Sequence, residues 1–359
     1  MWGGNPARTR VRAGAGPQGR PALRWTSPTG GAGPLVADDR GALADGVLYL
    51  PTDTGLVALD AATGRERWRA TGYGDAVVVD GDGLIVHGDI ASGAPSLARL
   101  RRADGRVVWT AEAGRQQPMW DPVVADGVGY TPSGSDFIAF DPASGRVLWR
   151  VPLSARASRG ASIANGLAVL GDTKGTVYGI ATEWGTVVWT ARLDAVTIGH
   201  PALANGTAYL PVSGGAQPAF VALDAATGST KWRFVAPTAS AFRPPAVDGT
   251  TVYLPCDDGT MYALDATTGG IAWQVRTGPV GVNPPALVGD TLYFATKAGI
   301  VYALDPATGA ERWRLALVGA SSDAALVGDR VYYLSTADGR LDAVGDAIPA
   351  VSTAVRRSS

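Results

Sequence analysis

Few side chains in this sequence could perform acid–base chemistry. His200 is one of two histidines, and an imidazole titrates close to neutral pH, which suits proton transfer. Asp121 and Asp323 are carboxylates that could exchange a proton with it, and Arg243 completes the set. If the protein is an enzyme, these four residues are the predicted catalytic group. Proton transfer or cyclisation without a cofactor is then the predicted type of reaction.

Other residues are suited to holding a ligand. The rings of Trp120 and Phe242 could stack on a planar group. The guanidinium groups of Arg159 and Arg243 could bind a carboxylate or a phosphate. Whether these residues act together depends on the elements that carry them.

Motifs of several established chemistries are missing from the sequence. It has no glycine-rich phosphate loop followed by Lys and Ser or Thr, and no His-Glu-x-x-His. Residues 160–164, Gly-Ala-Ser-Ile-Ala, come nearest to a Gly-x-Ser-x-Gly nucleophile turn but end in alanine. With two histidines and one cysteine, no metal site is predicted. That cysteine, Cys256, lies next to a predicted strand and is expected to be a small buried hydrophobic residue.

The elements that must position these residues come from an internal repeat of about 40 residues. Residues 57–68, Val-Ala-Leu-Asp-Ala-Ala-Thr-Gly-Arg-Glu-Arg-Trp, return with small changes at 138–149, 221–232, 262–273 and 302–313. The repeat leaves one tryptophan every 40 to 43 residues: Trp25, Trp68, Trp109, Trp149, Trp189, Trp232, Trp273 and Trp313. Chance does not space eight tryptophans in this way.

Each repeat predicts four short antiparallel strands separated by tight turns. In the copy at 285–313 we expect strands over 286–288, 291–295, 300–304 and 310–315, and helices should be nearly absent. Repeats of this kind form the blades of a β-propeller. The last repeat lacks its tryptophan strand, which residues 21–25 can supply. The sequence therefore predicts an all-β, eight-bladed propeller of four-stranded antiparallel blades, closed by the N-terminal strand completing the last blade.

The repeat also predicts the domain organisation. We expect an N-terminal lead-in over residues 1–20, one eight-bladed propeller domain over 21–346, and a flexible C-terminal tail over 347–359. The repeated aspartates are expected to cap tight turns by accepting backbone N–H bonds rather than to bind calcium. They are Asp60, Asp141, Asp224, Asp265 and Asp305.

A candidate binding site follows from the positions that break the repeat. Alignment of the repeats places residues of each blade just before its innermost strand, where loops converge on the axis of the ring. Variation from blade to blade at these positions is what a site grafted onto a repeated scaffold should show. The predicted ligand-binding funnel comprises Arg40, Asp75, Trp120, Asp121, Arg159, His200, Phe242, Arg243, Asn283 and Asp323. Longer loops over 87–96, 115–121 and 213–218 are predicted on the same face. The alternative is that the funnel residues are solvated loop residues.

The pattern Ala-x-Asp-x-x-Thr-Gly-x-x-x-Trp resembles the tryptophan-docking motif of the propellers named after pyrroloquinoline quinone (PQQ), and residues 2–9 resemble the lead-in that many of them share. The resemblance covers essentially the whole chain. The superfamily includes quinoprotein alcohol dehydrogenases, a lipoprotein of outer-membrane assembly, and sensor domains of actinobacterial serine/threonine kinases. The resemblance implies that each repeat tryptophan lies on an outermost strand and wedges against the next blade. It implies the fold and leaves the function open.

The same resemblance bears on cofactors. The quinoprotein dehydrogenases hold PQQ against a pair of adjacent cysteines and a tryptophan, with a calcium ion nearby. Cys256 is the sole cysteine of this sequence, so that platform cannot be assembled. We therefore expect a member close to the scaffold and sensor proteins, with no PQQ and no other cofactor.

Composition narrows the partners. The 31 basic and 32 acidic residues leave a formal net charge of -1, so neither nucleic acid nor an anionic membrane surface is an expected partner. No stretch approaches the roughly 20 apolar residues of a membrane helix, and the N-terminus has no apolar signal core. As written, the chain is expected to be a cytoplasmic monomer. It would be extracellular if it is a domain of a longer secreted or membrane-anchored protein.

These observations leave three functional hypotheses. The leading one is a non-catalytic binding module that recognises a small molecule or a protein partner at the loop-rich face and axial funnel. The second is the cofactor-free enzyme described above, of a kind found in specialised metabolism. The third is a scaffold in envelope assembly.

Overall fold

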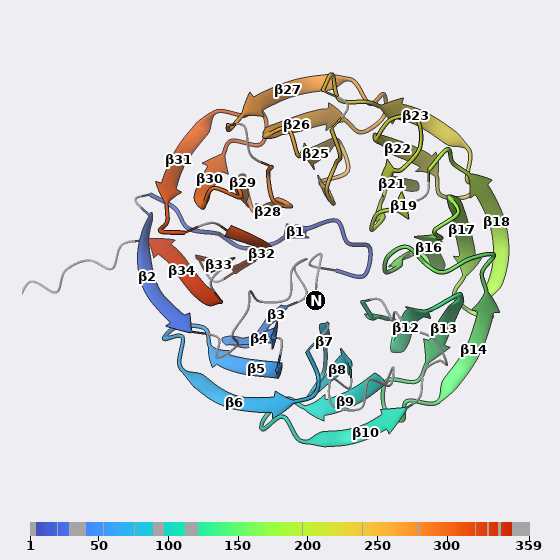
Figure 1. Ribbon diagram of the computed structural model, residues 1–359, viewed down its shortest axis with the longest axis horizontal. Helices are drawn as coiled ribbons and strands as arrows, with labels where there is room; N and C mark the ends of the chain where they lie inside the picture. The colour runs from blue at the N-terminus through green and yellow to red at the C-terminus, as the bar shows by residue number, and fades with distance from the viewer. Residues whose placement is uncertain are drawn as a thin grey trace, which may run out of the picture.

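Eight β-sheets form a closed ring around a central axis (Figure 1). The computed structural model describes residues 5–19, 21–28, 41–52, 54–74, 76–88, 97–111, 121–195, 197–238, 240–278, 281–319, 321–328, 330–336 and 339–346, and only the backbone of 197–198 and 321–328. Within these residues the regular elements are all strands. The predicted eight-bladed, all-β propeller is therefore confirmed. The expected tail over 347–359 lies outside the described residues.

The blades are numbered 1 to 8 in chain order, and each is a sheet whose strands follow one another from the axis outwards. Blade 1 comprises β3 (Ala42–Ala44), β4 (Val47–Thr52), β5 (Gly55–Asp60) and β6 (Glu66–Thr71), and blade 2 comprises β7 (Val77–Asp80), β8 (Gly83–His87), β9 (Leu97–Arg101) and β10 (Val107–Ala111). Blade 3 comprises β11 (Val123–Ala125), β12 (Val128–Ser133), β13 (Asp136–Phe140) and β14 (Val147–Pro152), and blade 4 comprises β15 (Ser162–Ala164), β16 (Leu167–Gly171), β17 (Thr176–Ala181) and β18 (Thr186–Arg192). Blade 5 comprises β19 (Thr197–Ile198), β20 (Ala202–Ala204), β21 (Thr207–Ser213), β22 (Ala219–Asp224) and β23 (Thr230–Phe234). Blade 6 comprises β24 (Ala246–Val247), β25 (Thr251–Pro255), β26 (Thr260–Asp265) and β27 (Ile271–Arg276). Blade 7 comprises β28 (Ala286–Val288), β29 (Thr291–Ala295), β30 (Ile300–Leu304) and β31 (Glu311–Ala316). The strands expected over 285–313 are confirmed by these last four.

Blade 8 is assembled from both ends of the chain. It comprises β32 (Ser321–Gly328), β33 (Val331–Thr336) and β34 (Arg340–Asp346), with β2 (Pro21–Pro28) as its outermost strand. Strand β2 pairs antiparallel with β34, and Trp25 lies opposite Ala343. This pairing confirms that the N-terminal strand closes the ring.

The repeat tryptophans dock each blade onto the next. Each of the eight lies on an outermost strand, as the family resemblance implies, and for seven of them the structure describes a bond from the indole Nε1–H to a backbone carbonyl in the neighbouring blade. The donor–acceptor pairs are Trp25 to Ala61, Trp68 to Arg102, Trp109 to Pro142, Trp149 to Thr182, Trp189 to Ala225, Trp232 to Ala266 and Trp273 to Pro306, at 2.8–3.3 Å. Burying each ring contributes on the order of 2–3 kcal/mol.

The Asp-x-x-Thr-Gly turn is shaped to receive that ring. In blade 1, Asp60 Oδ1 accepts bonds from the backbone N–H groups of Ala62 and Thr63 and from the Thr63 hydroxyl. The bond from Arg67, followed by those from Thr63, lowers the pKa of Asp60. Gly64 has a φ of 70°, and a Cβ there would lie 2.6 Å from Cε3 of Trp25. The aspartate thus caps the turn as predicted, and the glycine leaves space for the tryptophan of the preceding blade.

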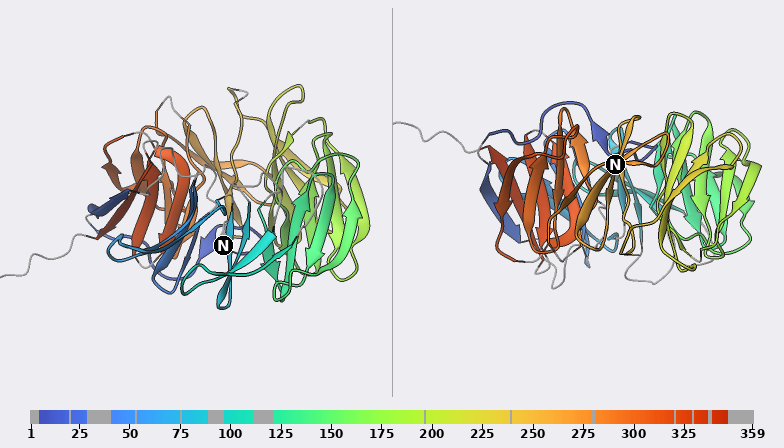
Figure 2. Two further views of the ribbon diagram at one scale, coloured as in Figure 1. Left: turned by 60° about the horizontal axis from the view of Figure 1, so that its bottom comes forward. Right: turned by 90° about the horizontal axis from the view of Figure 1, so that it is seen from above.

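The N-terminal segment, residues 5–19, adds a second, inner connection. It runs through the middle of the ring, and Figure 2 shows it, in blue, passing over one face. Its β1 (Val11–Arg12) pairs in parallel with β28 of blade 7. Backbone carbonyls of the segment accept bonds from one innermost strand after another, namely from the N–H groups of Ile163, Leu203, Val247 and Leu287, at 2.9–3.0 Å. The expected lead-in is therefore hydrogen-bonded along the inner edges of blades 4 to 7.

His87 differs from its prediction. It was expected to begin a long loop over 87–96, but it ends β8 and is buried, within 3.1 Å of the Thr131 hydroxyl in blade 3. A polar partner across the blade boundary explains why this side chain can remain in the core. Residues 89–96 lie outside the described residues. In the part of the chain that the structure describes, no helix is long and apolar enough to span a membrane.

Two glycine substitutions in blade 1 distinguish the energetic cost of backbone strain from the cost of displacing the docked tryptophan. Gly46 and Gly64 both have a φ of 70°, but a Cβ at Gly46 would have no atom within 4 Å. We expect Gly46→Ala to lower the free energy of unfolding by about 1 kcal/mol, which is the cost of a left-handed alanine. Gly64→Ala should lower it by about 3 kcal/mol, because Trp25 must also move. Urea denaturation measures both values, and equal effects would contradict the docking role of Gly64.

Candidate functional site

The structure describes six of the ten predicted funnel residues in full. These are Asp121, Arg159, His200, Phe242, Arg243 and Asn283, each placed shortly before an innermost strand. Asp323 lies in β32, where only the backbone is described, and Arg40, Asp75 and Trp120 lie outside the described residues. The grouping of all ten into one funnel stays a prediction.

The loops that enter the innermost strands meet the far ends of the second strands. The N–H groups of Ser158, Arg243 and Asn283 donate to carbonyls of Gly171, Pro255 and Ala295, respectively, at 2.8–3.0 Å. We call this side of the ring the loop face. The opposite side, which carries the turns between first and second strands and the Asp-x-x-Thr-Gly turns, is the turn face.

Asp121, His200 and Arg8 meet inside the ring. His200 Nε2 lies 3.4 Å from Asp121 Oδ2, and Arg8 Nη1 lies 3.9 Å from the same oxygen. All three side chains are almost completely buried: Asp121 is 4% exposed, His200 5% and Arg8 2%. The pair predicted for acid–base chemistry is therefore brought together, and it is shared with an arginine from the N-terminal segment.

Arg8 is the functional residue that the sequence analysis missed. Its backbone has a φ of 55°, an uncommon conformation for a residue other than glycine. Its Nε donates to the carbonyl of Ala161 at 2.8 Å, and its Nη2 lies 3.4 Å from the carbonyl of Asp121. Arg10 is also buried, with a φ of 56°. The only signal was the alternation of arginine at 8, 10 and 12 in a segment treated as a lead-in.

Gly160, which precedes the innermost strand of blade 4, lies next to all three residues of this cluster. A Cβ at Gly160 would lie 2.7 Å from Arg8 Nη2, 3.1 Å from the Asp121 carbonyl oxygen and 3.4 Å from His200 Cε1. A side chain at this position would have to displace the Arg8 guanidinium, so glycine suits the packing of the cluster. The glycine at the funnel position of blade 4 is thus explained by packing.

Asp172 fixes the loop that carries Gly160. Its Oδ2 accepts bonds from the hydroxyls of Ser154 and Tyr178, and its Oδ1 accepts the N–H groups of Lys174 and Thr176, at 2.6–3.0 Å. Burial alone would raise the pKa of Asp172, but these hydrogen bonds outweigh it and lower the pKa. The ionised carboxylate therefore ties Ser154, at the start of this loop, to the turn over residues 172–176.

We expect Asp172→Asn to lower the free energy of unfolding by about 1–3 kcal/mol at pH 7, because one amide cannot accept all four bonds. A carboxyl whose pKa is lowered by folding stabilises the protein above its unfolded pKa of about 4, and this contribution is lost as the pH falls. The difference between wild type and variant should therefore shrink below about pH 4. Denaturation curves from pH 3 to 8 measure it, and a constant difference would show that the charge is unimportant.

The other described funnel residues have separate surroundings. Phe242 is buried, with its ring centroid 5.6 Å from that of Phe234 and 6.2 Å from that of Phe220. Arg243 forms an ion pair with Asp257 at 2.8 Å, and Asn283 is fully buried. Arg159 is partly exposed and lies one residue before Gly160. Of this group, the two arginines retain surface that a ligand on the loop face could contact.

The Arg8 contacts predict a local effect of mutation. In Arg8→Ala the anchors to Ala161 and Asp121 are lost, so residues 5–12 should exchange their amide hydrogens at least about 10-fold faster, since a loss of ~1.4 kcal/mol corresponds to that factor. Hydrogen-exchange mass spectrometry measures this. The matched control is Arg106→Ala, whose side chain is 81% exposed and should leave exchange in the segment unchanged. Equal exchange in wild type and Arg8→Ala would remove the anchoring role.

The residues do not fit the PQQ platform of the quinoprotein dehydrogenases. Cys256 is fully buried in the core between blades 5 and 6, and burial raises its thiol pKa to about 12. Its expected role as a small buried residue is confirmed, and no second cysteine exists to pair with it. Within the described ranges, no group of three or more His, Cys, Asp or Glu residues could hold a metal ion.

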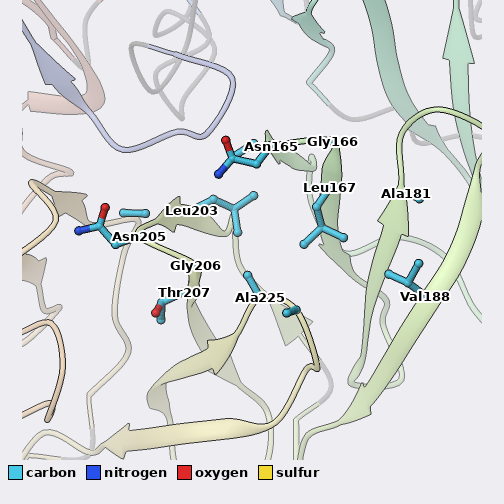
Figure 3. A pocket seen from close by; sticks show the side chains of 13 residues that line it. Asn165, Gly166, Leu167, Ala181, Val188, Leu203, Asn205, Gly206, Thr207 and Ala225 are labelled. Carbon is cyan, nitrogen blue, oxygen red and sulfur yellow. The ribbon is translucent and has the colours of Figure 1, made fainter.

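A cavity of about 350 Å³ opens elsewhere, on the turn face between blades 4 and 5 (Figure 3). Leu167, Val188 and Leu203 line it together with several alanines, and Asn165 and Asn205 lie at its rim. The cavity was not predicted from the sequence, because its walls combine turns and strand ends of two different blades.

Comparison with known proteins identifies the family. The sequence matches the family of outer membrane protein assembly factor BamB over residues 8–124, 133–276 and 210–357. The chain therefore belongs to this family of PQQ-repeat propellers. It is 28% identical over 282 residues to BamB of Escherichia coli K12, which covers 70% of each chain. It is 32% identical over 173 residues to the serine/threonine-protein kinase AfsK of Streptomyces griseus, covering 47% of this chain and 16% of the kinase.

BamB of Nitrosomonas eutropha, another relative, is matched over 34% of its length. The chain therefore spans only a minor part of this BamB and of the AfsK kinase. Solved structures support the fold alone. BamB from Moraxella catarrhalis superposes with a TM-score of 0.68 at 18% identity, covering 91% of this chain and 98% of that one. A europium-containing methanol dehydrogenase gives 0.74 at 12% identity, covering 96% and 97%, respectively.

Proposed function

We propose that this propeller is a non-catalytic binding module that holds a protein partner on its loop face. The carrying observation is the contact that Asp121 makes with both His200 and Arg8. This contact assigns the best acid–base pair of the funnel to anchoring the N-terminal segment, since all three side chains are at most 5% exposed. A buried pair that already shares an arginine is suited to fixing structure rather than to exchanging protons with a substrate.

The surface of the loop face supports the same proposal. Arg159 and Arg243 are partly exposed there and can donate to carboxylates or backbone carbonyls of a partner. Loops on a rigid scaffold are the usual place for recognition. Two relatives carry the name outer membrane protein assembly factor, and a third is a serine/threonine-protein kinase, which is consistent with a propeller that recognises other molecules.

Site-specific photo-crosslinking in the native cells tests this proposal. A benzophenone amino acid replaces Arg159 or Arg243 on the loop face, with Ala62 and Ala307, exposed residues of turn-face Asp turns, as matched control positions. We expect crosslinks to one protein partner from the loop-face positions and not from the controls, read by mass spectrometry. Crosslinks only from the controls, or from none of the four, would argue against a loop-face binding module.

A further inference from the structure

Blade 4 lacks a tyrosine that most other blades have. The second strands of blades 1, 3, 5, 6 and 7 place a tyrosine opposite the first residue of the innermost strand. These residues are Tyr49, Tyr130, Tyr209, Tyr253 and Tyr293. In blade 4 the equivalent residue, opposite Ser162, is Val169.

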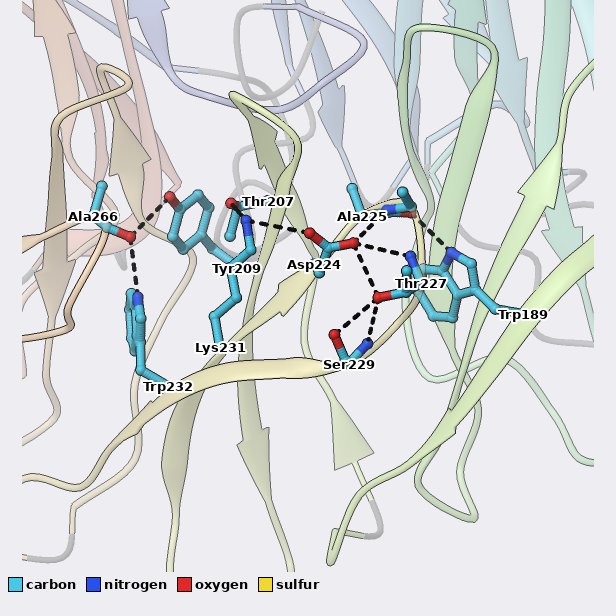
Figure 4. A network of polar contacts seen from close by, with 11 residues as sticks. Trp189, Thr207, Tyr209, Asp224, Ala225, Thr227, Ser229, Lys231, Trp232 and Ala266 are labelled. Carbon is cyan, nitrogen blue, oxygen red and sulfur yellow. Dashed lines mark hydrogen bonds and ion pairs between the residues drawn. The ribbon is translucent and has the colours of Figure 1, made fainter.

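In blade 5 this tyrosine bonds to the next blade. The Tyr209 hydroxyl donates to the carbonyl of Ala266 at 3.2 Å, and Trp232 Nε1 donates to the same oxygen at 3.0 Å (Figure 4). The two ring centroids are 5.9 Å apart. A phenol and an indole therefore share one carbonyl of the next blade and fill the boundary between the two blades.

At the boundary between blades 4 and 5 only the indole is present. Trp189 Nε1 donates to the carbonyl of Ala225 at 2.8 Å, as Figure 4 also shows. Gly179 lies opposite Trp189, where blades 1 and 5 have alanine, and a Cβ there would lie 2.1 Å from the indole Cε2. The indole therefore lies directly against its own sheet, and it also contacts blade 5, where a Cβ at Gly228 would lie 2.5 Å from its Cε3. The cavity thus lies at a boundary that has the docked indole but lacks the phenol.

The walls of the cavity match the place that a phenol would occupy. Ala225, whose carbonyl is equivalent to the acceptor of Tyr209, lines it, as does Leu167. Its volume of about 350 Å³ reaches the lower end of the range for ligand sites, about 300–1,000 Å³. Val188, also in the wall, is 53% exposed, so the cavity is accessible from solvent.

We propose that this cavity binds a phenol, a planar aromatic ring that packs between Leu167 and Leu203 and donates its hydroxyl to the carbonyl of Ala225. The ring replaces the tyrosine that the repeat omits here. The phenol can come from a free small molecule or from the side chain of a tyrosine in a peptide, and the two sources share this chemistry.

The probe is p-cresol, which is the tyrosine side chain as a free molecule, titrated into the full chain and followed by ligand-observed NMR. We expect a dissociation constant of about 0.1–1 mM, as befits so small a ligand. Toluene, which lacks the hydroxyl, should bind roughly fivefold more weakly. N-acetyl-tyrosinamide distinguishes the sources: binding as tight as that of p-cresol supports a peptide tyrosine, and loss of binding supports a free phenol.

Two variants locate the site. Val169→Tyr restores the repeat and fills the cavity, and Ala226→Leu narrows it from an exposed turn position and keeps the core intact. Each should weaken p-cresol binding at least about 10-fold. Ala62→Leu, the same turn position in blade 1, is the matched control and should bind as wild type does. Unchanged binding to Ala226→Leu, equal affinity for toluene and p-cresol, or no binding of p-cresol would overturn the proposal.

Discussion

The docking of one tryptophan onto the glycine of the next blade is the contact on which the ring depends. The indole needs a carbonyl for its N–H and a flat surface for its ring, and the Asp-x-x-Thr-Gly turn offers both. Each blade gives one ring and receives another, so a blade without neighbours leaves an apolar face exposed. Every blade has a neighbour on both sides only when the ring is closed. Strand β2 achieves this closure because it belongs to blade 8 and is followed in the chain by blade 1.

The N-terminal segment extends this constraint to the axis. The stretch that supplies Trp25 on the outside also runs along the inner edges of blades 4 to 7, where it accepts backbone hydrogen bonds. Inner strand edges would otherwise present unpaired N–H groups, which are costly when buried. Arg8 then reaches Asp121 and Ala161 from this segment and ties blades 3 and 4 to it. Polar side chains near the axis therefore serve in part to hold the N-terminal segment in place.

The residues that break the repeat have two different explanations. Gly160, Asp121 and His200 differ from their counterparts because they accommodate Arg8, a residue outside the repeat. Val169 differs because it replaces the tyrosine of the repeat, in a blade whose boundary with blade 5 contains a cavity. Variation within a repeat can therefore mark either an internal contact or an open site. Solvent access separates the two, because the first group is closed from solvent, whereas an accessible cavity lies at the boundary between blades 4 and 5.

The sequence alone determined the number of blades, the strands of blade 7, the capping role of Asp60 and the closure by Trp25. These features depend on local turn chemistry and on a period that chain connectivity preserves. Three features were decided by the tertiary structure: the path of residues 5–19, the burial of His87 against Thr131, and the cavity beside Ala225. Each joins residues from different blades or from outside the repeat, so no local pattern encodes it. His200 and Asp121 illustrate both cases: alignment of the repeats predicted that they lie on one face, and only the packed ring shows that Arg8 of the N-terminal segment contacts Asp121.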